Sequence, residues 1–355
     1  MTTTRPAPEV ERAAPRAGRS FGASLGRVGL VAVVLLAALV AVSVASLAWG
    51  VRDIGFGTVV RALVAPEEGN PLHSVVRDQR LVRTLIGLAA GAALGVSGAL
   101  LQGLTRNPIA DPGLLGINAG ASLAVIVAIA VFGIGQPAGF VWFAFAGAAA
   151  AAAVVYGAAS VGRDGATPVK LALIGAAVTA SSTSVITMVL LTDFQVTAAY
   201  RFWQVGALVN RPPDTLVTVL PFIVVGLLLA AGAARFLNAM ALGEDMARGL
   251  GQHVGRGRAL TLVAAVLLAG AATSLVGPIA FVGLMVPHAA RAMVGLDHRR
   301  MLPISALLGP VVLLAADVLG RLVVQPSELE AGLVAAAVGA PVLIVLIRRK
   351  GGGGL

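Results

Sequence analysis

Long apolar runs alternate with short polar segments along almost the whole chain. We identify ten such runs, at residues 28–49, 84–104, 113–134, 138–161, 169–192, 215–236, 259–276, 277–294, 303–323 and 331–347. A helix of about 20 apolar residues is long enough to cross a hydrocarbon layer of about 30 Å. The pattern therefore predicts an all-α polytopic membrane protein with about ten transmembrane helices. The eighth run is the weakest, because it contains Pro278, Pro287, His288 and Arg291.

The polar ends of the chain are expected to lie outside the membrane. Residues 1–27 are rich in Arg, Pro and Ala, which is typical of a disordered tail, and residues 350–355 form a short flexible tail after a basic cluster. A transmembrane domain would fill residues 28–349. An even number of crossings puts both termini on one side. Lys and Arg concentrate in the segments on that side, so the positive-inside rule predicts that both termini are cytoplasmic.

Composition agrees with a membrane protein and excludes several other classes. The chain is 58% hydrophobic and only 12% charged, which leaves too few charges to cover a soluble domain of 355 residues. Its net charge of +10 follows from the loop asymmetry, and no soluble basic face is present that would bind nucleic acid. The 44 glycines would let helix backbones approach closely within the bilayer.

An internal similarity suggests two related halves. The stretch "AGAALGVSGALLQGL" from Ala90 resembles "AGAATSLVGPIAFVGL" from Ala269. The predicted topology places the two stretches in opposite directions across the membrane. This relationship predicts inverted repeats, an arrangement found in many transporters.

Motifs for ATP hydrolysis, metal binding and covalent catalysis are missing from the sequence. A Walker A motif needs Lys followed by Ser or Thr, whereas Leu follows Lys170 and Gly follows Lys350. The chain has no cysteine, and its four histidines show no HExxH spacing. We therefore expect no enzymatic activity, no cofactor and no metal site in this chain. A membrane-embedded enzyme would need clustered His, Asp or Glu at helical spacing.

A charged pair in the ninth run bears on ion coupling. Asp317 is the deep acidic residue of the predicted spans, and Arg321 follows one helical turn later. A pair at i and i+4 accounts for both charges without proton or sodium coupling. An ion-coupled secondary transporter, the alternative class for this chain, would need a buried titratable site.

A detailed polar loop separates the second and third runs. The stretch "QGLTRNPIADPGLLG" contains Pro108 and Pro112, each of which removes a backbone donor and stops a helix. Asn107 and Asp111 can accept hydrogen bonds from free backbone N–H groups. Asp111 is placed to cap a helix that begins at Pro112. From spacing alone, a rigid capped turn explains these residues.

Two further segments are predicted as short helices outside the bundle. In "LGEDMARGLG", the apolar residues Leu242, Met246 and Leu250 recur on one helical face, and acids precede Arg248 as the helix dipole favours. This helix could lie on lipid or could face a soluble partner. In the outer segment 193–214, we expect an interfacial helix anchored by Tyr200 and Trp203.

Several long ordered stretches resemble the permeases of ABC importers for iron-siderophores and cobalamin, the FecCD type. They are "RLVRTLIGLAAGAALGVSGALLQGLTRNPIADPGLLG", "LGEDMARGLG", "GPIAFVGLMVPHAARAMVGLDHRRMLP", "AADVLGR" and "GLVAAAVGAP". The resemblance covers roughly residues 28–349. The loop after Arg321 departs from the family pattern, since "ELEAG" has Glu330 where the family has proline. Membership implies the inverted-repeat type II importer fold.

The resemblance also implies functional positions. Asn107, Pro108 and Ile109 would form a cytoplasmic gate, with Thr167 and Pro168 at a second gate. Arg80, Arg83 and Arg321 match arginines that receive acidic residues of a substrate-binding protein, although a lipid-phosphate anchor is the better explanation for any single outer arginine. The segment that would couple to the ATPase comprises Leu242, Gly243, Glu244, Asp245, Met246, Ala247, Arg248, Gly249, Leu250 and Gly251.

The implied machine has several partners. Two ATPase subunits would lie on the cytoplasmic side, and a binding protein or lipoprotein would dock outside. A second permease subunit would complete the path, either a copy of this chain or a sister, with the sister favoured. The substrate would be a ferric siderophore, with cobalamin or haem as alternatives. The location would be the cell membrane, with both termini in the cytoplasm, and apolar and small polar groups would line the passage.

Overall fold

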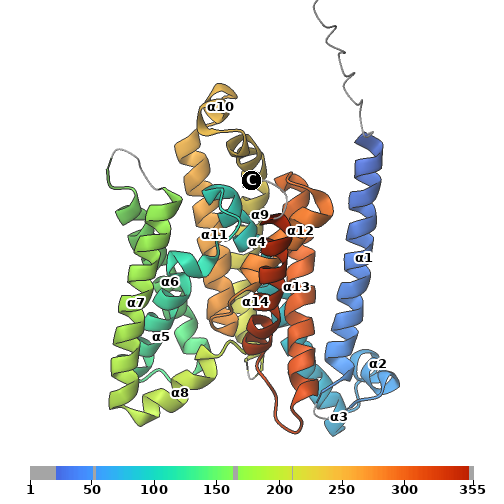
Figure 1. Cartoon of the computed structure of the whole chain (residues 1–355). Coiled ribbons are helices and arrows are strands. Elements are labelled where there is room, and N and C mark those ends of the chain that lie inside the picture. Colours follow the sequence, from blue (N-terminus) through green and yellow to red (C-terminus); the bar gives the residue numbers. More distant parts are fainter. Residues whose placement is uncertain (1–20, 51–52, 163–166, 210, 352–355) are drawn as a thin grey trace, which may run out of the picture.

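The computed structural model describes residues 21–50, 53–162, 167–209 and 211–351, and the regular elements in these ranges are all helical (Figure 1). Each of the ten predicted runs corresponds to a helix: α1 Phe21–Ala48, α4 Val82–Thr105, α5 Ile117–Phe132, α6 Pro137–Ala159, α7 Pro168–Thr192, α9 Pro213–Ala241, α11 Val254–Val276, α12 Val282–Val294, α13 His298–Val323 and α14 Ala331–Gly351. Seven candidate spans are long and apolar enough to cross a membrane, and α5, α12 and the apolar part of α14 are shorter. The predicted fold class is confirmed.

The eighth run forms a shorter helix than its apolar length suggests. Helix α12 has 13 residues, or about 20 Å at the rise of an α-helix, and residues 277–281 before it are not helical. Gly277 and Phe281 both adopt positive φ angles, of 84° and 68°. Gly277 and Ile279 of this irregular segment are buried, and it contacts α8 at Trp203 and α14 at Gly339, which is the protein-packed setting where a membrane protein tolerates non-helical backbone. A Cβ atom at Gly277 would overlap the carbonyl oxygen of Trp203.

Helix α4 forms the centre of the bundle and packs closely because its glycines face other backbones. A Cβ atom at Gly91 would lie 2.6 Å from the backbone of Pro310, in α13. A Cβ atom at Gly98 would overlap the carbonyl of Gly283, in α12. Such small-residue contacts are the main source of helix association in lipid.

The short helices lie at two opposite ends of the bundle (Figure 1). Helix α10, Glu244–Gly249, projects from one end, which we call the α10 end. Helices α2, Phe56–Val64, α3, Pro71–Ser74, and α8, Phe194–Gln204, lie at the other end, the α8 end. Helix α4 follows a π-helical turn at the α8 end, η1 Val75–Leu81, whereas α11 follows α10, so the two similar stretches run in opposite directions.

Both ends of the helical chain lie at the α10 end of the bundle (Figure 1), as an even number of crossings requires. Helix α1 begins at Phe21, so the last residues of the predicted tail 1–27 are helical. Helix α14 continues to Gly351, into the predicted tail 350–355. The rest of the two predicted tails, residues 1–20 and 352–355, lies outside the described residues.

The prediction that Tyr200 and Trp203 anchor α8 at the membrane surface is wrong. Each side chain is only 1% exposed, and the Trp203 ring packs edge-on against Phe140 with centroids 6.4 Å apart. Phe194, at the start of α8, is instead an exposed aromatic residue of this helix, with 86% of its surface accessible. Aromatic residues suit a core and a membrane surface equally well, so composition could not separate the two sites.

Candidate functional site: the arginine pocket and the α10 end

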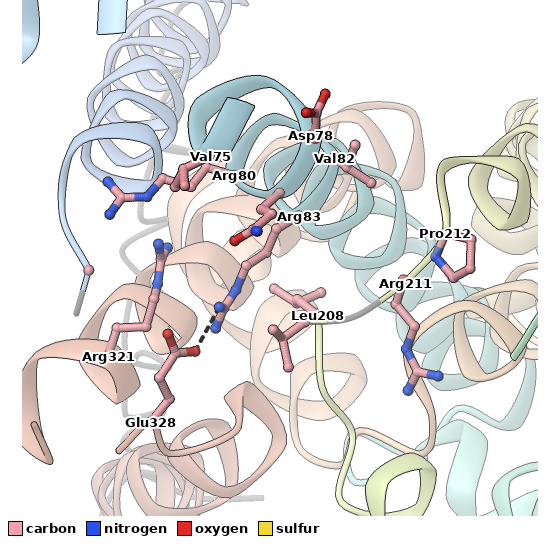
Figure 2. A pocket seen from close by; sticks show the side chains of 13 residues that line it. Val75, Asp78, Arg80, Val82, Arg83, Leu208, Arg211, Pro212, Arg321 and Glu328 are labelled. Atoms are coloured by element: carbon pink, nitrogen blue, oxygen red, sulfur yellow. Dashed lines mark hydrogen bonds and ion pairs between the residues drawn. The ribbon is translucent and has the colours of Figure 1, made fainter. Parts of the chain in front are cut away.

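A buried ion pair joins α4 to α13 at the α8 end. The guanidinium of Arg83 donates to the carboxylate of Asp317 with both Nε and Nη2, and the Nη2–Oδ1 distance is 2.8 Å. Its Nη1 donates to Oε2 of Glu328 at 2.7 Å (Figure 2). Asp317 is fully buried, and its other oxygen accepts from Nη2 of Arg321 at 2.9 Å. The predicted i, i+4 pair is therefore present, with Arg83 added to it.

Two arginines cap the end of α1. Nη1 of Arg80 donates to the carbonyl oxygens of Leu47 and Ala48, at 2.8 and 2.7 Å. Nη1 of Arg321 donates to the carbonyls of Ser46 and Trp49, both at 3.0 Å. The last carbonyls of a helix lack partners within the helix and carry partial negative charge, so guanidinium groups stabilise them.

The donors of Arg321 are fully used. An arginine side chain has five N–H donors, and Arg321 makes five bonds, to Ser46, Trp49 and Asp317. Arg83 uses only one N–H of each terminal nitrogen in its bonds to Glu328 and Asp317. The three arginines predicted for docking are buried, with exposed fractions of 2% to 8%.

These arginines border a pocket of about 610 Å³ at the α8 end (Figure 2). The pocket is lined by Gly50, Val75, Asp78, Gln79, Arg80, Val82, Arg83, Leu208, Val209, Arg211, Pro212, Arg321 and Glu328. Arg211, which stands just before α9, was missed by sequence reasoning. Desolvation lowers the pKa of its guanidinium to about 10, so it remains ionised at neutral pH. Its position in an outer segment, against the charge bias, was the available signal.

The predicted gate loop is a capped turn. Oδ1 of Asn107 accepts from the N–H of Ile109 at 3.1 Å, and Pro108 and Ile109 are exposed. Oδ1 of Asp111 accepts from the N–H of Gly113 at 2.8 Å and caps a short 3₁₀ helix, η2. The predicted cap at Asp111 is confirmed.

The gate loop lies beside the start of α7. Helix η2, Pro112–Leu115, packs against α7, and one small pocket is lined by both Asn107 and Leu171. Thr167 caps α7 by accepting from the N–H of Lys170 at 3.3 Å, and Pro168 is the first residue of that helix. The two stretches predicted as gates are thus neighbours.

Helix α10 presents an apolar face to the surroundings. Leu242, Met246 and Leu250 are 68%, 57% and 58% exposed, whereas Ala247 is buried against the bundle. The carboxylate of Glu244 holds Arg248 within the segment and Arg258 in α11, each at 2.7 Å. Gly243 and Gly251 flank the helix with positive φ angles of 117° and 78°. In the described part of the molecule, Leu242, Met246 and Leu250 therefore form an exposed apolar projection that is anchored to the bundle, which we call the apolar knob.

Helix α7 exposes hydroxyl groups in the middle of a candidate span. Ser181, Thr183, Ser184 and Thr187 are all exposed. Thr183 and Ser184 donate to carbonyls one turn earlier on the same helix, at 2.8 and 2.9 Å. Side-chain hydroxyl groups within a span can also hydrogen-bond across to a neighbouring helix.

The described residues contain no group of three or more His, Asp or Glu side chains that could hold a metal ion. Among these residues, the arginine pocket gathers the predicted docking positions at the α8 end. The stretches predicted as the gate and as the coupling segment lie near the α10 end, where one pocket is lined by both Arg106 and Glu244.

Known proteins with similar sequences and structures are membrane permeases. The model of the FecCD transport family matches residues 35–349. The chain is 44% identical over 320 residues to the ferric enterobactin transport system permease protein of Escherichia coli (strain K12). The aligned region covers 90% of this chain and 95% of that protein. It is 37% identical over 332 residues to the iron(3+)-hydroxamate import system permease protein of Bacillus subtilis (strain 168). That alignment covers 94% of this chain and 85% of that protein.

A solved structure has the same fold. It is described as an ABC transporter of the metal-chelate type in an inward-facing conformation, and it matches with a TM-score of 0.76 and 25% identity over 89% of this chain and 97% of that chain. The fold and the extent of these matches define the protein as a multi-pass membrane permease. The chain belongs to the FecCD transport family.

Proposed function

We propose that this chain forms half of the membrane path of an ABC importer that carries ferric siderophores into the cytoplasm. The observation that carries the proposal is the 44% identity to the ferric enterobactin permease over 95% of its length. Cobalamin and haem are the alternative substrates. The chain adds no chemistry to its cargo, and separate subunits supply ATP hydrolysis. Both termini face the cytoplasm of a multi-pass protein in the cell membrane, in agreement with the basic segments at the α10 end.

The α10 end is the proposed contact with two ATPase subunits. An exposed apolar face on a short helix, held by Glu244 to Arg258, suits insertion into a groove of a soluble protein. The rest of the segment Leu242–Gly251 sets the position of this helix. A lipid-surface helix is the alternative, and it would place the same face in the membrane boundary.

A second permease subunit is proposed to face α7. The exposed hydroxyl groups of α7 favour contact with a partner helix or a water-filled passage over contact with lipid tails. Such small polar groups suit the passage of a large hydrophilic chelate, because they bind it weakly. We favour a sister chain over a second copy. The gate residues Asn107, Pro108, Ile109, Thr167 and Pro168 would close this passage at its cytoplasmic end.

The α8 end is proposed to receive the substrate-binding protein. Arg80 and Arg83 reach the pocket and can accept an incoming carboxylate in addition to their present partners. Arg321 would support the site without binding the partner directly, because its five donors are bonded to Asp317 and to Ser46 and Trp49 at the end of α1. Salt should weaken such contacts, because dissolved ions screen charges at the surface. Charge pairs of this kind raise the association rate more than they raise the affinity.

An ion-coupled carrier is less compatible with the geometry. The buried carboxylate of Asp317 is already bonded to the guanidinium groups of Arg83 and Arg321, so it is not an open site for a coupling ion.

Uptake of ⁵⁵Fe-labelled ferric siderophores by cells with and without this chain tests the proposal. We expect loss of uptake on deletion and recovery on re-expression. A partner ATPase with its Walker lysine replaced should fail to support uptake. Unchanged uptake in the deletion strain for every ferric chelate tried, together with lost cobalamin or haem uptake, would assign the alternative substrate.

A further inference from the structure

Arg211 is a cation without a matching anion in the described part of the pocket. Its Nε donates to the carbonyl oxygen of Ala207 at 3.4 Å, and no carboxylate lies within ion-pair distance of it among the described residues. Burial alone accounts for the lowered pKa of this guanidinium, which means that no nearby acid offsets its desolvation. An incoming anion would remove that cost.

The other arginines of the pocket differ in this respect. Arg83 is paired with Asp317 and Glu328, and Arg321 is paired with Asp317. Arg80 is bonded to carbonyl oxygens at the end of α1. In Figure 2, Arg211 stands across Leu208 from Arg83 and Glu328. Among the described residues of the pocket, Arg211 is therefore a cation that neither pairs with a carboxylate nor caps a helix end.

Helices α4 and α13 are in close contact next to the pocket. One turn beyond Arg83, a Cβ atom at Gly87 would overlap the side chain of Leu314 and lie 3.3 Å from Leu208. One turn further, Gly91 packs on the backbone of Pro310. This contact leaves no path for a chelate between α4 and α13 below Arg83, whereas the pocket itself can admit a side chain.

We propose that Arg211 receives a carboxylate side chain of the substrate-binding protein when that protein docks at the α8 end. This inference rests on the proposed function and adds a contact that lies outside the three arginines matched to the family. The planar guanidinium fork pairs with both oxygens of a carboxylate, and its enclosed position strengthens the pair relative to one in open water. An Asp or Glu on a projecting loop of the partner is the occupant.

Binding of the substrate-binding protein encoded with this permease tests the proposal directly. Purified permease–ATPase complex in nanodiscs would be titrated with that protein for the wild type, Arg211→Gln and Arg211→Lys. The matched control is Arg201→Gln, which removes an exposed charge from α8 at the same end. We expect Arg211→Gln to weaken binding by about tenfold and to reduce its salt dependence, Arg211→Lys to lose less, and Arg201→Gln to stay within about twofold.

Thermal unfolding separates docking from a structural role. Because the charge of Arg211 is uncompensated, Arg211→Gln should leave the unfolding midpoint unchanged or raise it. A lowered midpoint accompanied by weaker binding would make Arg211 a structural residue and overturn the inference. Binding by Arg211→Gln equal to that of the wild type would also overturn it, leaving the proposed function intact. A wild-type complex that binds no such protein would instead contradict both.

Discussion

At the scale of single residues, Asp317 holds three helices together. Its carboxylate bonds to Arg83 of α4 and to Arg321 of its own helix, α13, and Arg321 in turn holds the carbonyl groups at the end of α1. The site combines two buried cations with one fully buried anion, so each charge depends on the others. The cluster that sequence reasoning assigned to docking thus also fixes α1 on the bundle.

Removal of the charge of Asp317 should destabilise the protein strongly. Asp317→Asn leaves two buried guanidinium groups without their shared anion, a change that costs about 3–5 kcal/mol in buried ion pairs. The control is Glu328→Gln, whose partly exposed carboxylate should contribute less than about 1 kcal/mol. Thermal unfolding of the purified permease measures both. Equal midpoints for Asp317→Asn and the wild type would mean that the network does not support the fold.

The carboxyl of Asp111 should make stability depend on pH. Burial raises its pKa to about 6, against a hydrogen bond from Gly113 that lowers it. The unfolded chain therefore binds fewer protons than the folded chain between its ordinary pKa of 3.8 and about 6, so folding stability falls as pH rises through this window.

Asp111→Asn keeps the helix cap and removes the titration. Relative to the wild type, the variant should gain stability as the pH rises from about 4 to about 6, by at most about 3 kcal/mol. Unfolding midpoints of both proteins across this pH range provide the test. A constant difference between them would show that Asp111 titrates normally in the folded protein.

At the scale of secondary structure elements, α10 concentrates exposed apolar area on a single short helix. Its anchoring through Glu244 to α11 would transmit a force applied at the knob to the bundle, where α11 packs against α4. The gate loop follows directly from the end of α4. A partner that moves α10 is therefore connected to the gate through two packed helices.

Met246→Asp should uncouple ATP hydrolysis from transport. The substitution places an unpaired charge in the apolar contact proposed for the ATPase, which is unfavourable by several kcal/mol when buried. The control is Asp245→Asn, which changes a fully exposed neighbour on the same helix. Both variants should reach the membrane, and only Met246→Asp should lose substrate-stimulated ATPase activity. Normal activity in Met246→Asp would support a helix that lies on lipid.

The apolar pattern predicted the elements better than it predicted their contacts. All ten runs became helices, because membrane insertion depends on the average hydropathy of about 20 residues. The shortening of α12 depends on positive φ angles at Gly277 and Phe281, which hydropathy does not report.

The sequence did not predict which distant residues contact one another in the folded chain. Arg83 meets Asp317 from 234 positions away. Trp203 is a core residue that packs on Phe140 of α6, and Tyr200 packs on Trp203. Arg211, like Arg83, is an arginine of an outer segment, against the charge bias. Only the pocket distinguished the unpaired cation from the paired ones.

At the scale of the whole molecule, the two ends of the bundle present different surfaces and segments. The α8 end holds a pocket bordered by four arginines, and the α10 end holds an apolar knob, the gate loop and both ends of the helical chain (Figure 1). A permease that receives cargo from a binding protein and energy from an ATPase needs this division.

Cysteine crosslinking tests the gate across the assembled permease pair. Because the chain has no native cysteine, Asn107→Cys and Ile109→Cys provide clean probes. We expect efficient crosslinking between subunits in one nucleotide state and poor crosslinking in another. Gly232→Cys, at an open position on α9, is the control and should not change with nucleotide. Equal crosslinking of the loop in every state would identify it as a fixed structural corner.

The measurement that tests the central claim most directly is transport in proteoliposomes containing the permease pair and its ATPase, with the binding protein and a ⁵⁵Fe-labelled siderophore outside. The account predicts accumulation that requires both ATP inside the vesicles and the binding protein outside, and that a proton or sodium gradient cannot replace. Accumulation driven by an ion gradient in vesicles that contain this permease without the ATPase would contradict it.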